Sequence, residues 1–487
     1  MRWTIQQVVG ALGVALLPGS WLDPLARLAG VSIDSRTVRP GELFVAIHGP
    51  RHDGHTFVAA ALQAGALGAV VARSRLGEYP EAIRSRLVAV ADTLAALQRL
   101  AGAVRAAWGE QPGRRLAAVS GSIGKTTTKE ILAALLAARF RVLKSEGNLN
   151  NAYGLPLTLL RLEEDHDAAV VEVAMSRRGE LAQLAAMARP EVGVVTNVAP
   201  VHLEFFSSVN EIALAKRELI EGLAGNEAVA VLNADDPHVA RFAEGFRGRV
   251  VTFGFGAAAQ FRAGEVEDRG AEGSAFSFLA PTERAQLNLP LAGRHNVANA
   301  LAALAAASAW EVGAAEARLV FPRLRPAAMR GEVLRFEEGF AVINDCYNSN
   351  PAALASAVEL LASTRGYRRR VLVAGEMLEL GPAGVELHRE AGRHAAQRGL
   401  DWLIAVQGLA AEIRSGAVEA GLPPERARFF ASSEEAAEFV TRFVCPGDLV
   451  LVKGSRGVKM ERIVETLQKK FAPLGEAAAA RGHQERA

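Results

Sequence analysis

The 487-residue sequence has few cysteines, little net charge and no long hydrophobic run. Its two cysteines, Cys346 and Cys445, cannot build a disulfide framework or a zinc site, and they suit a reducing cytoplasm. A formal net charge of +2, with no block of Lys or Arg, argues against nucleic acid as the main partner. The apolar residues 8–17 are fewer than the roughly 20 that a membrane span needs, and Pro18 and Gly19 follow them. We expect a cytoplasmic protein without an integral membrane segment, in which residues 8–17 form a core-packing helix.

Short apolar runs alternate with helical patterns along the rest of the chain. The runs expected to be strands are 168–173, 192–197, 228–232, 250–253, 341–344, 371–374, 403–405 and 449–452. Apolar strands separated by helices form parallel sheets that are covered on both faces. We therefore predict an α/β fold with three domains. They are a small α/β domain at 1–82, a central phosphate-loop-type domain with a parallel sheet at 83–312, and a Rossmann-like domain at 313–487.

Residues 116–130, LAAVSGSIGKTTTKE, join an apolar strand to a helix through a turn bracketed by glycines. Backbone N–H groups in such a turn surround phosphate oxygens, and the helix N-terminus adds partial positive charge. Lys125 can reach the β- and γ-phosphates, and the hydroxyl of Thr126 can bind Mg²⁺. The residues expected to hold the phosphates are Gly121, Ser122, Ile123, Gly124, Lys125, Thr126 and Thr127. The segment predicts a nucleoside triphosphate site, although Val119 replaces the first glycine of the usual pattern.

Two strands after this turn end in polar residues. Glu172 ends one strand, and a buried carboxylate is costly unless it meets a cation. His202 follows the end of the next strand on a loop. Carboxyl ends of parallel strands share the edge where ligands bind, so we predict that Thr126, Glu172 and His202 hold Mg²⁺. An arginine partner for Glu172 and a structural role for His202 are the alternatives.

Taken in order, these segments resemble the Mur ligase family, ATP-dependent enzymes that form amide bonds in peptidoglycan precursors. The resemblance covers nearly the whole chain and runs through GSIGKTTTKE, GNLNNAYGLPLTLL, TNVAPVHLE, KRELI, LNADDP, GRHNVANALAA, MRGE and DCYNSNP. DSRTVRPGELFVAI, TTTKE, GEMLELG and VKGSRGVKME are similar to the member that acts last. The resemblance implies ATP and Mg²⁺ as cofactors, UDP-N-acetylmuramoyl-tripeptide and D-alanyl-D-alanine as substrates, and a monomer.

The resemblance also implies roles for individual residues. The catalytic residues would be Lys125, Glu172, His202 and Lys216. Further ATP ligands would be Asn296, Arg330 and Asp345. The uridine end would meet Ser35 and Arg36, and the sugar or peptide would meet Asn148, Asn150, Asn151, Thr196 and Asn197. The incoming dipeptide would meet Asn348, Asn350, Lys453, Ser455 and Arg456.

Several alternatives stay open at this point. Lys216 could be a solvated helix lysine, and its carbamylation, known in related ligases, is undecided. Asn296 could cap its helix. The runner-up function is the preceding ligase, which adds a diamino acid to the same nucleotide sugar. A folylpolyglutamate-type ligase and a nucleotide-dependent switch without ligase activity are the other possibilities, and the third residue of the tripeptide could be lysine or diaminopimelate.

Overall fold

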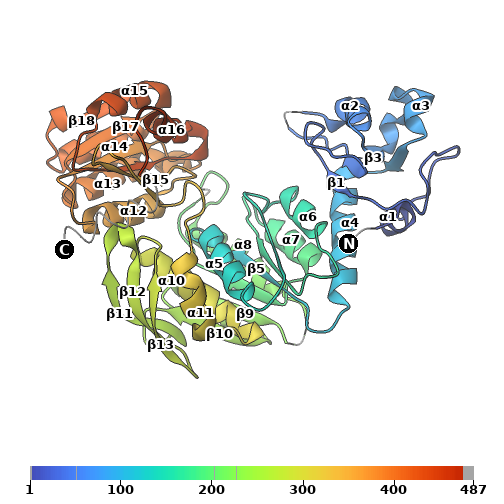
Figure 1. Ribbon diagram of the computed structural model, residues 1–487, viewed down its shortest axis with the longest axis horizontal. Coiled ribbons are helices and arrows are strands. Elements are labelled where there is room, and N and C mark those ends of the chain that lie inside the picture. Colours follow the sequence, from blue (N-terminus) through green and yellow to red (C-terminus); the bar gives the residue numbers. More distant parts are fainter. Residues whose placement is uncertain (1–2, 51, 202, 226, 475–487) are drawn as a thin grey trace.

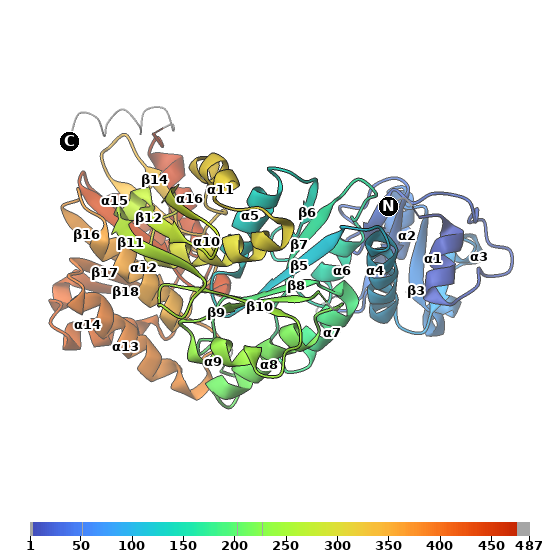
Figure 2. The ribbon, with the colours of Figure 1, turned by 90° about the horizontal axis from the view of Figure 1, so that it is seen from below.

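The computed structural model describes residues 3–50, 52–201, 203–225 and 227–474. These residues form three α/β parts, each built around its own sheet, and the first and third parts rise from the two ends of the central part in a V-shaped arrangement (Figure 1). The first part, in blue, and the third part, in orange and red, stand at opposite ends of the central part (Figure 2). The predicted α/β fold class is therefore confirmed. No helix of the described residues is long and apolar enough to cross a membrane.

The first part contains a parallel sheet in the order β1-β2-β3-β4. Its elements are α1 (Ile5–Leu12), β1 (Gly30–Ser32), β2 (Glu42–Val45), η1 (Gly54–Phe57), α2 (Val58–Gln63), β3 (Gly68–Ala72), η2 (Arg73–Glu78), α3 (Glu81–Arg84) and β4 (Leu87–Val90). The helix predicted over 8–17 starts earlier, because Thr4 caps α1 by accepting the N–H of Gln7. It also ends earlier, because Gly13 adopts the left-handed conformation at its C-terminus.

The central part holds a mixed sheet in the order β13-β12-β11-β10-β9-β8-β5-β7-β6. Its strands are β5 (Arg115–Ser120), β6 (Val142–Lys144), β7 (Ala168–Glu172), β8 (Val192–Val195), β9 (Val229–Asn233), β10 (Arg249–Gly254), β11 (Phe261–Asp268), β12 (Ser274–Leu279) and β13 (Arg284–Leu289). The strands from β5 to β10 pair in parallel, whereas β12 pairs antiparallel with β11 and β13. The sequence predicted the parallel strands β5 and β7 to β10 but missed the short strand β6 and the extension from β11 to β13.

Helices cover both faces of this central sheet (Figure 2). They are α4 (Thr93–Gly109), α5 (Lys125–Leu136), α6 (Gly154–Leu159), α7 (Glu180–Ala188), α8 (Val209–Glu221), α9 (Pro237–Ala240), η3 (Arg241–Ala243), η4 (Gly270–Glu272), α10 (Arg294–Ala307), η5 (Ser308–Trp310), α11 (Ala314–Val320) and η6 (Phe321–Arg323). The two cores on either side of the sheet are almost entirely apolar. Apolar strands packed on both faces are what a parallel sheet requires.

The third part contains a sheet in the order β14-β15-β19-β16-β17-β18. Its elements are β14 (Glu332–Arg335), β15 (Ala341–Asp345), α12 (Pro351–Ser363), β16 (Arg369–Gly375), η7 (Gly381–Ala383), α13 (Gly384–Gln397), β17 (Trp402–Val406), α14 (Ala410–Glu419), η8 (Pro424–Arg426), β18 (Ala427–Phe430), α15 (Ser433–Phe443), β19 (Asp448–Lys453), η9 (Arg456–Val458) and α16 (Glu461–Lys470). All pairs except β14–β15 are parallel. The predicted strands 341–344, 371–374, 403–405 and 449–452 correspond to β15, β16, β17 and β19, whereas β14 and β18 were missed.

The positions of two elements bear on the domain boundaries. β4 pairs with β3 in the first sheet, although it begins after residue 82. The central core continues through α11 to Leu324, and Arg139 donates to Glu316 of α11 at 2.8 Å. We therefore propose boundaries at the start of α4 and between Leu324 and β14, in place of 82 and 312.

Candidate active site

The phosphate-loop turn lies between the buried strand β5 and helix α5. Gly124 occupies the N-cap position with φ 86°, which is the left-handed region that favours glycine. A Cβ atom on Gly124 would overlap the side-chain oxygen of Asn299, and one on Gly121 would overlap the hydroxyl of Thr196. Both glycines therefore allow close approaches between this turn and neighbouring elements, and the predicted binding of phosphate by the turn stays a prediction.

Asn197 and Thr196, which follow β8, hold the back of this turn. The N–H of Ile123 donates to Oδ1 of Asn197 at 2.9 Å, and Nδ2 of Asn197 donates to the carbonyl of Ile123 at 3.1 Å. The hydroxyl of Thr196 donates to the same carbonyl at 2.6 Å. The N–H of Ser122 donates to the Asn197 carbonyl at 3.0 Å. The two residues assigned to substrate thus fix the loop conformation, and their contact with substrate stays a prediction.

Lys125, the first residue of α5, folds back across its own loop. Its Nζ donates to the carbonyls of Gly121 at 2.9 Å and Ser122 at 3.2 Å. Burial lowers the pKa of Lys125; nearby Glu172 opposes this shift, while Arg330 adds to it. The ammonium therefore lies within reach of the mouth of the turn, close to a carboxylate and a second cation.

Glu172 ends β7 and is only 3% exposed. Its Oε2 accepts the hydroxyl of Thr126 at 2.8 Å, and its Oε1 accepts Nδ2 of Asn150 at 2.8 Å. Both of these partners are neutral. Among the described residues, no arginine pairs with the Glu172 carboxylate, as the alternative of an arginine partner would require. A carboxylate and a hydroxyl side by side form an oxygen donor set. His202, the third predicted metal ligand, lies outside the described residues.

Arg330 extends from the third part to the phosphate-loop helix. Its guanidinium donates to the hydroxyl of Thr126 at 3.3 Å and lies 3.9 Å from the centre of the Tyr347 ring. Sequence reasoning found Arg330 but missed Tyr347, which stabilises the planar guanidinium by cation–π contact. The arginine and Thr126 are separated by 204 positions, so the fold brings two of the predicted ATP ligands together.

Asp345 and Lys453 form an ion pair at the ends of neighbouring strands. The register pairs Asp345 of β15 with Lys453 of β19, and Nζ of Lys453 lies 2.6 Å from Oδ2 of Asp345. Nζ also donates to the carbonyl of Asn348 at 3.0 Å. Burial lowers the pKa of His295, at the start of α10, and the charge of Asp345 opposes this shift. The structure thus joins a residue assigned to ATP with two assigned to the dipeptide.

Lys216 lies on α8 and is 3% exposed, so the alternative of a solvated lysine is wrong. Burial lowers the pKa of Lys216 well below the ordinary lysine value, and the charge of Lys125 lowers it further. The two lysines that the sequence assigned to catalysis are thus electrostatically coupled, and their roles stay predictions.

Asn296 and Asn299 form a buried amide pair on α10. Nδ2 of Asn299 donates to Oδ1 of Asn296 at 3.0 Å, and Nδ2 of Asn296 donates to the carbonyl of Ala292 at 2.7 Å. Gly293 occupies the N-cap position, so the alternative of helix capping by Asn296 is wrong. Asn299 was missed, although its spacing of three residues from Asn296 puts both on one helix face.

The remaining predicted dipeptide ligands gather around β19 and the start of α12. Asn350 caps α12 by accepting the N–H of Ala353 at 2.9 Å, and Oδ1 of Asn348 accepts the N–H of Ser349 at 2.9 Å. The hydroxyl of Ser455 accepts the N–H of Leu378 at 2.9 Å, while Arg456 pairs with Glu461 at 3.2 Å. These contacts give each residue a structural role, and substrate binding by them stays a prediction.

The asparagine-rich loop before α6 combines a turn with the site. Oδ1 of Asn151 accepts the N–H groups of Tyr153 and Gly154, and the carbonyl of Asn148 accepts the N–H of Asn150. Asn150 alone of the three reaches Glu172. Outside this loop, Thr127, another of the predicted phosphate ligands, lies in the first turn of α5 and is half-buried. The loop is thus both the turn cluster and the neighbour of the site that the sequence suggested.

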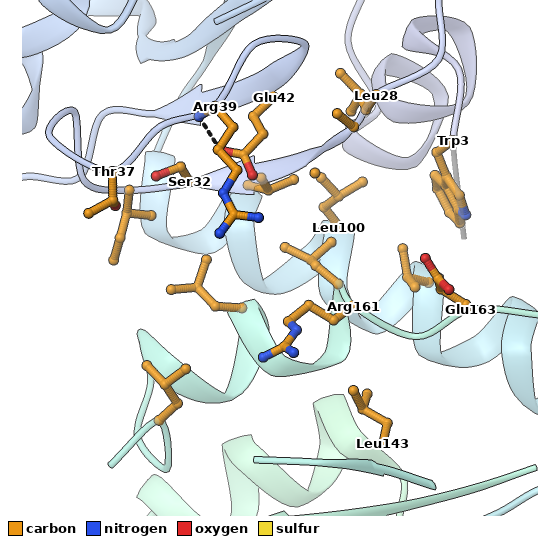
Figure 3. A pocket seen from close by; sticks show the side chains of 18 of the residues that line it. Trp3, Leu28, Ser32, Thr37, Arg39, Glu42, Leu100, Leu143, Arg161 and Glu163 are labelled. Carbon is orange, nitrogen blue, oxygen red and sulfur yellow. Dashed lines mark hydrogen bonds between the residues drawn. The ribbon is translucent and has the colours of Figure 1, made fainter. Parts of the chain in front are cut away.

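A cavity of about 760 Å³ separates the first part from the central part. Arg39 projects into it from the first part and Arg161 from the central part (Figure 3). Ser32 and Thr37 also line it, whereas the predicted residues Ser35 and Arg36 are not among its lining. The Arg36 guanidinium is largely exposed and pairs with Asp34 at 2.6 Å. Asp34, the residue before Ser35, does line the cavity. The predicted residues therefore lie beside the cavity and not in its lining.

A phosphate-loop sheet with a buried carboxylate, flanked by two further α/β parts, defines a nucleoside-triphosphate-dependent enzyme of three domains. The chain belongs to the Mur ligase family. The family's catalytic-domain description matches residues 27–105, its middle domain matches 119–307, and the glutamate ligase domain matches 329–456.

Named relatives and solved structures agree with this membership. The chain is 34% identical to UDP-N-acetylmuramoyl-tripeptide–D-alanyl-D-alanine ligase of Bacillus subtilis, over 90% of this chain and 93% of that protein. It is similar to MurF from Acinetobacter baumannii, with 29% identity, a TM-score of 0.84, and coverage of 96% and 99%. MurF from Thermotoga maritima in complex with ADP matches with 29% identity, a TM-score of 0.77, and coverage of 90% and 97%.

Proposed function

We propose that this chain is an ATP-dependent, ADP-forming ligase that joins D-alanyl-D-alanine to UDP-N-acetylmuramoyl-tripeptide. The reaction belongs to the synthesis of peptidoglycan precursors, and we place it in the cytoplasm. The observation that carries the proposal is the contact between Thr126 and Glu172 beside Lys125, in a chain that spans nearly the full length of ligases with this activity. A monomer remains our expectation.

The chemistry requires no nucleophile from the protein. The terminal carboxylate of the tripeptide attacks the γ-phosphate of ATP, which forms an acyl phosphate and releases ADP. The amine of D-alanyl-D-alanine then attacks the activated carbonyl, and phosphate leaves from the tetrahedral intermediate. The protein accelerates both steps by positioning the reactants and by neutralising phosphate charge.

The residues present fit Mg²⁺. The hydroxyl of Thr126 and the carboxylate of Glu172 are hard oxygen donors, and the carboxylate is buried with only neutral partners in the described part of the chain. They would hold the ion together with His202. When bound, Mg²⁺ neutralises charge on the phosphates of ATP.

On the nucleotide side, Lys125 exchanges the two loop carbonyls for phosphate oxygens. Lys216, whose pKa is lowered by the charge of Lys125, acts on the same phosphate charge. Arg330, fixed by the Tyr347 ring, meets the phosphates from the third part. Asn296 and Asp345 take the remainder of the nucleotide. Since these groups come from two parts of the chain, closure of the third part over the nucleotide completes the site and excludes water.

On the acceptor side, the cavity between the first and central parts takes the nucleotide-sugar end. Arg39 and Arg161 present planar guanidinium groups from opposite walls, which suits a diphosphate (Figure 3). Ser35 and Arg36 lie on the segment beside it. The dipeptide binds at the third part, near Asn348, Asn350, Lys453, Ser455 and Arg456.

The test follows phosphate release from ATP with UDP-N-acetylmuramoyl-tripeptide, in the presence and absence of D-alanyl-D-alanine. We expect release that depends on both substrates, together with a product of the summed mass. A parallel assay offers the dipeptide precursor and a diamino acid. Stimulation only in the parallel assay favours the preceding ligase, and no stimulation in either assay overturns the ligase assignment.

A further inference from the structure

A second cavity, of about 310 Å³, adjoins the Glu172 carboxylate. Asn150 lines this cavity and also donates to Oε1 of Glu172 at 2.8 Å, so the cavity begins one side chain away from the carboxylate. Gln98 of α4 and Glu180, the first residue of α7, supply polar lining. The apolar walls come from Met175, Leu184 and Met187. None of the reaction steps described above uses this space.

The chemistry of the proposed function, on which this inference rests, says what must lie nearby. The carboxylate that receives the phosphoryl group belongs to the third residue of the tripeptide. The side chain of that same residue is attached one carbon away, so it needs room next to the reacting centre. The 760 Å³ cavity, between the first and central parts, is assigned above to the opposite end of the acceptor.

Glu180 provides the charge in the smaller cavity. Its Oε2 accepts the N–H groups of Ser176 at 2.7 Å and Arg177 at 3.1 Å. Its Oε1 accepts no hydrogen bond from the described residues, and no Lys, Arg or His is among the described residues that line the cavity. The cavity combines apolar and neutral polar side chains with a single carboxylate, which matches an aliphatic chain that ends in an ammonium group.

We propose that this cavity binds the side chain of the tripeptide's third residue and that Oε1 of Glu180 accepts its terminal ammonium. Lysine and diaminopimelate share this chemistry, since both carry an amine at the far end of an aliphatic chain. Glu180 is thus a specificity residue for the acceptor. It touches neither ATP nor the dipeptide.

The experiment compares kcat/KM for paired acceptors in the wild-type protein and in Glu180→Gln. One pair carries lysine or norleucine at the third position, and the other carries diaminopimelate or 2-aminopimelate, which lacks the distal amine. The wild type should prefer the amine-bearing member of at least one pair by about tenfold to a hundredfold, as expected for a hydrogen bond to a charged group. Glu180→Gln should bring that ratio close to one. Its amide oxygen can still accept the N–H groups of Ser176 and Arg177, so the loop is preserved.

Glu211→Gln is the matched control. Glu211 also lies in the first turn of a helix and accepts a backbone N–H four residues earlier, that of Ser207 at 2.8 Å, but it does not line the cavity. This variant should keep the wild-type ratio. A second variant, Ala152→Leu, fills the cavity from its wall. It should raise KM for the lysine acceptor at least tenfold and spare an acceptor with alanine at the third position.

The outcomes separate the two proposals. Phosphate release that depends on D-alanyl-D-alanine, with ratios unchanged by Glu180→Gln in both pairs, overturns this inference and leaves the ligase assignment intact. Equal impairment of the lysine and alanine acceptors by Ala152→Leu also overturns the inference alone. If phosphate release by the wild type does not depend on D-alanyl-D-alanine with any of the acceptors, both proposals are overturned.

Discussion

The hydroxyl of Thr126 donates to Oε2 of Glu172 at 2.8 Å, which joins the first turn of α5 to the end of strand β7. Both groups are oxygen donors, and a hard cation prefers such donors. The two side chains come from adjacent strand–loop units because β5 and β7 are paired in parallel, with Val119 opposite Glu172. The hydrogen bond therefore holds together the two side chains that we propose to bind the metal.

Replacement of Thr126 tests this relationship. Thr126→Val keeps the shape of the side chain but removes the hydroxyl, and we expect kcat/KM for ATP to fall by about 10²–10³-fold, the range for loss of a preorganised charge-stabilising group. Thr126→Ser retains the hydroxyl and should stay within a few-fold of the wild type. Phosphate-release kinetics over a range of Mg²⁺ concentrations give both values. A valine variant with wild-type kinetics would contradict the assignment.

Gly124 allows a prediction about backbone geometry. Gly124→Ala places a side chain at φ 86°, against the Asn299 side-chain oxygen, so it should destabilise the protein by about 1–3 kcal/mol. Adding Asn299→Ala removes the overlap but not the backbone strain. We therefore expect Gly124→Ala to lower the free energy of unfolding by less in the Asn299→Ala background than in the wild type. Denaturant unfolding of all four proteins measures the coupling.

A double-mutant cycle without coupling would show that the overlap does not exist. Gly113→Ala provides the control, since Gly113 also has a positive φ, 84°, but an added Cβ atom meets nothing within 4 Å. It should show the backbone strain alone.

The two hydrogen bonds between the side chain of Asn197 and the backbone of Ile123 predict an effect on nucleotide affinity. Asn197→Asp keeps an oxygen that can accept the N–H of Ile123 but loses the donor to the Ile123 carbonyl. It also adds a negative charge behind a turn that must receive phosphate. We expect the Kd for ADP, measured by calorimetry, to rise at least tenfold, because a like charge directly opposes the ligand.

Asn197→Ala loses both hydrogen bonds without adding charge, so its affinity should lie between those of the wild type and Asn197→Asp. A Kd for Asn197→Asp at or below that of Asn197→Ala would contradict the electrostatic argument. Raising the salt concentration should narrow the difference between the two variants.

Some strands of this fold have a clear pattern in the sequence, and others do not. The parallel strands were predictable because neighbouring residues of one strand, such as Val170 and Val171, are buried in the cores on opposite faces of the sheet, which gives a continuous apolar run. The strands β12 and β13 were missed, although their alternating burial follows the period of two typical of half-exposed strands. Alternation over six residues is a weaker signal than a continuous apolar run.

Candidate site residues were predictable where polar residues end buried strands, as at Glu172, and where the phosphate-loop spacing fixes Lys125, and their roles stay predictions. Partners from distant elements were not predictable. Tyr347 meets Arg330, and Arg39 faces the same cavity as Arg161, through the arrangement of whole domains. A single sequence carries no local signal for such pairs.

Lys216 provides a prediction that links stability to pH. An unfolded lysine titrates at the ordinary value of 10.5, whereas burial and Lys125 hold the pKa of folded Lys216 well below it. Between these two values the unfolded state binds more protons than the folded state, so this lysine makes the protein less stable as the pH falls from 10.5. Lys216→Met should therefore unfold at a higher temperature than the wild type at neutral pH. The difference should shrink as the pH approaches 10.5.

The same variant should lose at least about a hundredfold in kcat, because it removes an amine that we propose to act on the bound phosphates, whose negative charge favours its protonated form. Lys216→Arg separates the two effects, since a guanidinium stays charged when buried and should destabilise the protein at every pH. Lys469→Met, at an exposed position of α16, is the control and should show no difference in unfolding temperature that changes with pH. Thermal unfolding from pH 7 to 10 measures all three variants. A Lys216→Met protein less stable than the wild type at pH 7 would mean that the lysine is charged and compensated in the folded state.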